Sequence, residues 1–175
     1  VFVQSGAGAL GSVLCRHALS TGCRVVTTVG SEAKVAALQD LFGDDVVGDG
    51  AGGEQLTAVV ARGAAIPGAL LAGGHGPFDC IAAVVNGEAR SLLFNQLRNR
   101  GRYVDLGKPS GPDEVQLTVA VDGNRTLSRI DTDQIAADDP EWFNDLITRA
   151  LTKVQDSRNH TPVTRYPVSQ LPAAI

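Results

Sequence analysis

The sequence predicts an α/β fold: a Rossmann-like, doubly wound parallel sheet with helices on both faces. Short apolar or β-branched runs alternate with segments whose apolar positions repeat at helical spacing. This alternation builds βαβ units, and βαβ units make a parallel sheet. The chain also opens on an apolar run that leads without a gap into a glycine-rich turn, "VFVQSGAGALG", and then into a helical pattern.

Each element near the start of the chain has a local signal. An apolar run predicts a strand over 1–4, and apolar residues at helical spacing predict a helix over 8–21. A β-branched run predicts a strand over 23–29. Helical spacing returns over 31–42, where Ser31 is the expected N-cap.

The middle of the chain has weaker signals. The stretch "DDVVGDG" (44–50) predicts a short strand and a turn, and residues 55–62 are expected to be helical. Residues 63–77 are rich in glycine, proline and alanine and are expected to form a loop. Three elements are then expected in order: a strand over 78–85, a helix over about 88–99 and a strand over 101–107.

The last third is expected to begin with a loop, because "KPSGPDE" (108–114) contains two prolines and a glycine. "NRTLSRI" (124–130) predicts a weak strand at an edge of the sheet, and Pro140 is expected to begin a helix that runs to about 155. A short strand is expected over 163–169.

Composition excludes several classes of protein. The net charge is −4, and no basic stripe is present, which argues against a nucleic-acid partner. No apolar run reaches the roughly 18 residues of a membrane span. The three cysteines lack metal-ligand spacing, so no metal site is expected, and they are interpreted as reduced, buried thiols of a cytoplasmic protein. The chain contains no methionine and starts within a strand, so it is expected to be an excerpt of a larger polypeptide.

The glycines of the first turn predict a dinucleotide site. Gly6 would permit a tight turn, Gly8 a close approach of the backbone to a diphosphate, and Gly11 close packing of the helix on the sheet. Ala9 and Leu10 begin the helix, whose free amides and positive dipole end would face the phosphates. In the alternative interpretation, the glycines only pack a βα unit.

The end of the second strand indicates which dinucleotide. An NAD site would place an aspartate or glutamate there to hold the ribose hydroxyls. This chain instead has Thr27, Thr28, Gly30, Ser31 and Lys34, whose hydroxyls, helix start and ammonium suit a phosphate, so the expected cofactor is NADPH. Alternatively, Ser31 only caps a helix and Lys34 is a solvated surface residue.

Four stretches carry a resemblance to a known family: "SGAGALG", "GCRVVTTVGSEAKVAALQDLFG", "GRYVDLGK" and "PVTRYPVSQLPAAI". With them, the chain resembles the medium-chain dehydrogenase/reductase superfamily. More narrowly, it is similar to the enoyl reductase domain of reducing polyketide synthases and of animal fatty acid synthase. The resemblance implies that residues 1–175 form the dinucleotide-binding (Rossmann) subdomain and that the substrate-binding half is not in this chain.

The resemblance also implies a reaction. It would be the NADPH-dependent reduction of the α,β-double bond of an enoyl thioester on an acyl carrier protein, with hydride transferred to the β-carbon. The family's candidate proton donor after the "GRY" strand corresponds to Lys108, and Gly107 would allow close approach of the nicotinamide. Expected partners are the carrier-bound acyl chain and the other domains of the same synthase, and a homodimer through the strand near 125–130 is left open. The isolated chain is expected to be inactive.

Three departures from the family pattern leave activity open. Ser110 stands where an aspartate is usual, Ala83 and Val84 stand where an Asn-Ser-Leu-like turn is usual, and "VVGDGAGG" (46–53) lacks a Ser-Arg pair. The chain is therefore expected to be either part of a working reductase or a degenerate reductase retained as a structural element of a synthase. A free-standing enzyme similar to quinone oxidoreductases is a third alternative.

Overall fold

In the computed structural model, the described residues are 1–43, 47–48, 55–107, 123–154 and 167–170. A seven-stranded sheet runs through them in the order β3-β4-β2-β1-β5-β6-β7, and every neighbouring pair is parallel. The strands are β1 (Phe2–Val3), β2 (Val25–Val29), β3 (Val47–Gly48), β4 (Leu56–Val60), β5 (Phe78–Ala83), β6 (Leu97–Asp105) and β7 (Thr126–Arg129). The predicted Rossmann-like α/β fold is thus confirmed.

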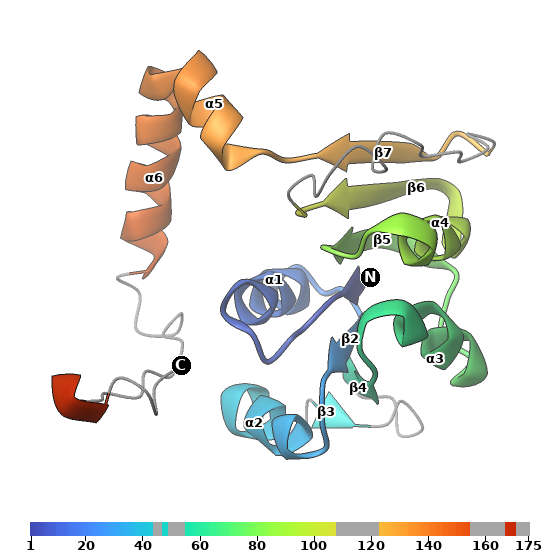
Figure 1. The fold of residues 1–175 in the computed structure, drawn as a ribbon. Helices are drawn as coiled ribbons and strands as arrows, with labels where there is room; N and C mark the ends of the chain where they lie inside the picture. The colour runs from blue at the N-terminus through green and yellow to red at the C-terminus, as the bar shows by residue number, and fades with distance from the viewer. Residues whose placement is uncertain (44–46, 49–54, 108–122, 155–166, 171–175) are drawn as a thin grey trace.

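Helices cover both faces of this sheet, as Figure 1 shows. On one face lie α1 (Ala9–Ser20) and α2 (Ala33–Phe42), and on the other lie α3 (Ile66–Ala72) and α4 (Gly87–Asn95). A 3-10 turn (Gly63–Ala65) precedes α3. After β7, α5 (Thr132–Asp138) and α6 (Pro140–Val154) pack against each other, and a last 3-10 turn covers Val168–Gln170. No helix in these ranges is long and apolar enough to cross a lipid bilayer.

Two apolar clusters hold the layers together, one on each face. Because side chains alternate along a strand, Phe2 and Val3 of β1 enter different clusters. The cluster under α3 and α4 includes Phe2, Leu70 and Leu93, and the cluster under α1 and α2 includes Val3 and Leu38. Both clusters are therefore anchored on the short central strand that leads into the glycine turn.

The expected helix over 55–62 is wrong. Residues Leu56–Val60 form β4, which pairs with β2 at five positions, from Val25–Leu56 to Val29–Val60. Its β-branched residues fit a strand, and the partner β2 is distant in sequence, so the pairing outweighs a local helical pattern. The adjoining stretch, expected to be a loop, contains α3, which has Pro67 in its first turn and buries Ile66 and Leu70.

Three further boundaries differ from expectation. The helix expected over 88–99 ends at Asn95, because Leu97 already pairs with Phe78 in the sheet. A helix not foreseen, α5, begins after Asp131, whose carboxylate accepts the amides of Asp133 and Gln134. Of the strand expected over 163–169, residues 163–166 lie outside the described ranges, and the 3-10 turn at Val168–Gln170 occupies its end. The loop expected over 108–114 also lies outside them.

The strand expected over 101–107 is present as β6 but begins earlier, at Leu97. Of the strand and turn expected over 44–50, only β3 (Val47–Gly48) lies in the described ranges. β7 is an edge strand, as its polar sequence predicts, and α6 begins at Pro140. The three cysteines are free, but only Cys15 is buried, whereas Cys23 and Cys80 are half-buried. The expectation of buried thiols therefore holds for Cys15 alone.

Candidate cofactor-binding site

The candidate site lies where the strand order of the sheet reverses. From β1 the chain proceeds outward through β2 on one side, and it returns to pair β5 on the other side of β1. The connections that follow β1 and β5 lie on opposite faces of the sheet, and their divergence leaves a crevice at the carboxyl ends of the strands (Figure 1). Open α/β sheets bind their ligands in this crevice. Two adjoining cavities, of about 280 and about 240 Å³, occupy it, and both are lined by Gln4, Ser5 and Gly8.

The turn between β1 and α1 is tightly built. Ser5 has a left-handed backbone (φ 58°), and its carbonyl accepts the Gly8 amide at 2.8 Å. The expected tight turn therefore bends at Ser5, whereas Gly6 is needed because a Cβ there would collide with the Thr27 side chain. At Gly11 a Cβ would collide with the Ser5 carbonyl, in agreement with the role predicted for that glycine in helix–strand packing.

The start of α1 offers unpaired amides to this crevice. The first hydrogen bond within the helix runs from the Ser12 amide to the Gly8 carbonyl at 2.9 Å, so the amides of residues 9–11 have no acceptor in the helix. Gly8 is the N-cap and has no side chain to cover them. Both the free amides and the helix dipole favour an anion at this position.

The larger cavity has a cationic wall. It is lined by Thr28, Gly30 and Lys34 at the end of β2 and start of α2, and by Arg62 after β4. The Arg62 Nε donates to the Gly30 carbonyl at 2.9 Å. This bond holds the Arg62 guanidinium against the end of β2, in the same cavity wall as Lys34. Among the described residues that line this cavity, none is a carboxylate. The cavity therefore suits a dianionic phosphate better than a ribose diol.

Ser31 does not act as the predicted cap. The N-cap of α2 is Glu32, and no side chain caps the helix. The Ser31 carbonyl instead accepts the Lys34 amide at 3.0 Å, and Ser31 is not among the residues that line either cavity. The helix thus begins later than the sequence pattern predicts.

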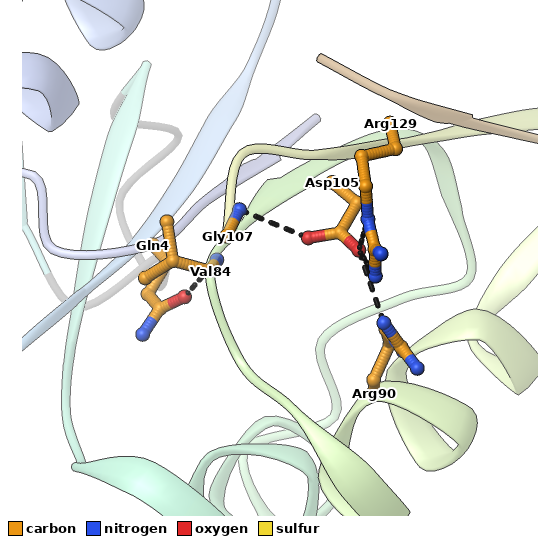
Figure 2. Close-up of polar contacts among 6 residues, drawn as sticks. All are labelled: Gln4, Val84, Arg90, Asp105, Gly107 and Arg129. Carbon is orange, nitrogen blue, oxygen red and sulfur yellow. Dashed lines mark hydrogen bonds and ion pairs between the residues drawn. The ribbon is translucent and has the colours of Figure 1, made fainter. Parts of the chain in front are cut away.

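The smaller cavity is mainly apolar. It is lined by Leu10 and Leu14 of α1, by the end of β5 with Val84 after it, and by Leu106 after β6. Gln4 links the end of β1 to β5. Its backbone amide donates to the Ala82 carbonyl at 3.0 Å. Its side-chain Oε1 accepts the Val84 amide at 2.7 Å (Figure 2). Such a wall suits a flat, uncharged ring.

The end of β6 beside this cavity is fixed by a buried carboxylate. The Oδ1 of Asp105 accepts the Gly107 amide at 3.0 Å, and its Oδ2 accepts Arg90 Nη1 at 3.1 Å and Arg129 Nη2 at 2.9 Å (Figure 2). Asp105 is fully buried, and Tyr103, two residues earlier, faces the same side. Burial, with the nearby Asp105 charge, raises the pKa of the Tyr103 hydroxyl well above its ordinary value.

The structure brings most of the predicted site residues together. Gly8, Thr28, Gly30 and Lys34 line the larger cavity, and Gly8, Ala9, Leu10 and Gly11 line the smaller one. Gly6, Ser31 and Gly107 line neither, although Gly6 and Gly107 belong to the turns that frame them. Lys108 lies outside the described residues, and so does Ser110.

Sequence reasoning missed Gln4 and Arg62, and it did not assign a role to Asp105. Arg62 follows β4, the strand that lies beside β2. Of the "VVGDGAGG" stretch, which lacks the family's Ser-Arg pair, only Val47 and Gly48 lie in the described ranges. The misassigned helix over 55–62 concealed Arg62.

Comparisons with known proteins agree with this fold. No protein-family model matches the sequence. Over its full length the chain is 25% identical to a reducing polyketide synthase of Floropilus chiversii, and over 98% of its length it is 28% identical to a highly reducing polyketide synthase of Penicillium crustosum. The chain spans only about 7% of the length of each of these synthases.

The solved structures that resemble this chain include enoyl reductase domains of polyketide synthases. An enoyl reductase domain of a polyketide synthase superposes with a TM-score of 0.67 at 26% identity, covering 94% of this chain and 85% of the other. The nucleotide-binding subdomain of the enoyl reductase domain of PpsC from Mycobacterium tuberculosis superposes with a TM-score of 0.70 at 23% identity, covering 93% and 85%. A mycobacterial protein solved with NADPH superposes at 0.63 with 21% identity, covering 99% of this chain and 51% of the other.

The relatives of this chain are thus reducing polyketide synthases, and its structural neighbours are polyketide synthase enoyl reductase domains of the medium-chain dehydrogenase/reductase superfamily, which it matches over their nucleotide-binding half.

Proposed function

We propose that residues 1–175 are the NADPH-binding half of an enoyl reductase domain that reduces the α,β-double bond of acyl-carrier-protein-bound enoyl thioesters in a polyketide or fatty acid synthase. One observation carries the proposal: the free amides of α1 open onto a crevice with a cationic cavity, lined by Lys34 and Arg62, and an adjoining apolar cavity. The likeness to synthase enoyl reductase domains supports it.

The residues present fit the cofactor's three parts. The amides of residues 9–11 would hold the diphosphate, because Gly8 has no side chain and leaves the approach to them open. A larger residue at position 8 would also place its Cβ only 3.1 Å from the Ser5 carbonyl. Lys34 and Arg62 would hold the 2′-phosphate of the adenosine, and no lining carboxylate in the described chain would repel it. The apolar cavity would take the nicotinamide.

When bound, reduced nicotinamide supplies the hydride for the β-carbon of the double bond. The residues of this chain would orient the ring: Leu10, Val84 and Leu106 exclude water from the side that they line. In the sequence, Lys108 directly follows Gly107, whose amide is held by Asp105. Its ammonium is the group we propose as proton donor to the α-carbon.

The substrate-binding half and the partners would be supplied by the rest of a larger synthase. The relatives support this proposal, because the chain matches only about 7% of their length. We therefore expect the isolated chain to bind NADPH without turnover, and the carrier-bound thioester to be positioned by residues of the other half.

A second candidate is a degenerate reductase that the synthase retains as a structural element. The observation that favours it is the wall of the apolar cavity at the end of β5, where Ala83 and Val84 present no polar side chain. In addition, the Val84 amide is already occupied by Gln4. A working site would then depend on groups elsewhere to stabilise the reacting thioester.

Fluorescence of the reduced cofactor separates these candidates. Titration of NADPH with the 175-residue chain should give saturable binding that is at least about tenfold tighter than that of NADH, because one phosphate with two cations contributes more than about 1.4 kcal/mol. The reductase completed with its substrate half should then oxidise NADPH in the presence of a crotonyl thioester. Binding without oxidation would establish the degenerate candidate, and no saturable binding would eliminate the working reductase and leave only a structural role.

A further inference from the structure

Asp105 is a buried charged residue whose carboxylate accepts hydrogen bonds from Arg90, Gly107 and Arg129. Its carboxylate has no solvent exposure, and it joins three elements: β6, on which it lies, α4 through Arg90, and β7 through Arg129. Arg90 is also buried, with 2% exposure, and Arg129 is 32% exposed. A buried charge is costly to retain, so this carboxylate needs an explanation.

The hydrogen bonds of Asp105 are divided between its two oxygens. Oδ2 accepts from both arginines, Arg129 donating through Nε at 3.2 Å and Nη2 at 2.9 Å. Oδ1 accepts from the Gly107 backbone amide alone among the bonds described. The arginines thus fix the carboxylate, and the carboxylate in turn fixes the backbone two residues later.

That backbone segment forms one wall of the apolar cavity. Leu106, between Asp105 and Gly107, lines the cavity, and its own amide donates to the Ala83 carbonyl at 2.9 Å. Gly107 lies so close to the next strand that an added Cβ would be 3.3 Å from the Val84 carbonyl and 3.2 Å from Asp105 Oδ1. The Val84 amide in turn donates to Gln4. Neighbouring residues therefore lead from Gln4 through Val84 and Gly107 to Asp105 (Figure 2).

We propose that Asp105 is a positioning residue for the nicotinamide end of the cofactor. Clamped by Arg90 and Arg129, it holds the Gly107 amide and so sets the wall formed by Leu106 and Val84. This inference rests on the proposed NADPH site. It predicts that Asp105 affects the nicotinamide part of the ligand and has no effect on the part bound by Lys34 and Arg62.

Asparagine at position 105 tests the role with little change in shape. Both oxygens of Asp105 accept from N–H donors, four nitrogen atoms of three residues in all, so either orientation of an asparagine amide places its NH₂ against another donor. Asp105→Asn should therefore release the Gly107 segment. Asp79→Asn is the matched control, because Asp79 pairs with Arg98 of the same strand β6 but is 70% exposed.

The experiment compares two ligands on the full chain: NADPH, followed by cofactor fluorescence, and adenosine 2′,5′-bisphosphate, followed by calorimetry. For Asp105→Asn we expect the Kd of NADPH to rise about tenfold or more, the loss expected for a buried donor left unsatisfied. The Kd of the bisphosphate should stay within about twofold of wild type. Asp79→Asn should change neither.

An unchanged Kd of NADPH in Asp105→Asn would overturn the positioning role. If that variant loses both ligands together, Gly107→Ala decides, because its Cβ displaces the same segment without altering either arginine. A selective loss of NADPH in Gly107→Ala supports the role, and an unchanged affinity overturns it. If the wild-type chain binds neither ligand, the proposed NADPH site itself is wrong, and this inference falls with it.

Discussion

At the scale of single residues, cofactor preference depends on two cations that come from different elements. Lys34 lies on α2, and Arg62 follows β4, yet both line the same cavity. Their side chains are exposed, so each contributes less to phosphate binding than a buried cation would.

Removing either cation should reduce the preference for NADPH over NADH. For Lys34→Ala and for Arg62→Ala we expect the ratio of the two Kd values to fall about five- to tenfold, since each loses a charge-assisted contact worth about 1 kcal/mol. NADH affinity should change little. Arg98→Ala, which removes an exposed arginine at the other end of the sheet, is the control. An equal loss for both cofactors would contradict the assignment.

Gly11 is required for the packing of α1 against the turn that follows β1, whether or not a ligand is bound. Alanine there would collide with the Ser5 carbonyl, which is backbone and cannot move aside cheaply. Gly11→Ala should lower the free energy of unfolding by about 1–3 kcal/mol in urea denaturation. Gly68→Ala in α3, where no atom lies within 4 Å of the added Cβ, should instead be neutral or stabilise by up to about 1 kcal/mol. Equal effects would show that the turn is looser than described.

Cys15 gives the protein a predictable response to alkaline pH. Burial raises the pKa of its thiol to about 11, and the side chain is fully buried. Above pH 9 the thiol of the unfolded chain ionises while the folded one keeps its proton, so stability falls as the pH rises from about 9 to about 11. Between pH 8 and 10.5 this amounts to about 2 kcal/mol.

Urea denaturation at the two pH values measures that loss. Cys15→Ala should lose about 2 kcal/mol less stability than wild type over this interval, although it is less stable at pH 8 because it leaves a small cavity. Tyr103, whose pKa is also raised by burial, contributes an alkaline loss in both proteins and therefore cancels. Parallel losses in the two proteins would show that Cys15 does not titrate as described.

At the scale of elements, the clearest lesson comes from β4. Its sequence, "LTAVV", is short and follows a glycine-rich stretch, and the pairing with β2 at five positions, together with the pairing with β3, establishes it as a strand. Pairing partners distant in sequence are invisible to a local window. The elements predicted well, such as α1 and β5, have strong local signals: helical apolar spacing in one and a mainly apolar run in the other.

The strand assignment of β4 can be checked by substitution. Leu56 is fully buried, and Val60, at the other end of the same strand, is 42% exposed. Leu56→Ala should lower the free energy of unfolding by about 2–5 kcal/mol, and Val60→Ala by less than about 1 kcal/mol. Urea denaturation of the two variants provides the comparison. Similar losses would contradict the described burial of this strand.

The residues of the candidate site also differ in whether a short stretch of sequence is enough to predict them. The glycine turn, Thr28, Gly30 and Lys34 follow directly from short sequence stretches, because each belongs to one βα unit. Gln4, Arg62 and Asp105 act across strands: Gln4 on β5, Arg62 on the end of β2, and Asp105 on α4 and β7. Their roles appear only when the order of the strands is known.

At the scale of the whole molecule, the order of the sheet explains where these groups meet. β1 lies between β2 and β5 in the sheet, and the helices lie on both faces (Figure 1). The crevice lies at the carboxyl end of β1, the strand that carries the glycine turn. One side of the crevice is cationic and the other apolar. This division matches a ligand with a phosphorylated adenosine at one end and an uncharged ring at the other.

The central claim concerns the position of that ligand, and a crystal structure of the full chain with NADPH tests it most directly. We predict a diphosphate against the amides of residues 9–11, a 2′-phosphate within hydrogen-bond distance of Lys34 and Arg62, and a nicotinamide beside Val84 and Leu106. NADPH bound elsewhere, or a crevice without NADPH at saturating concentration, would contradict the account.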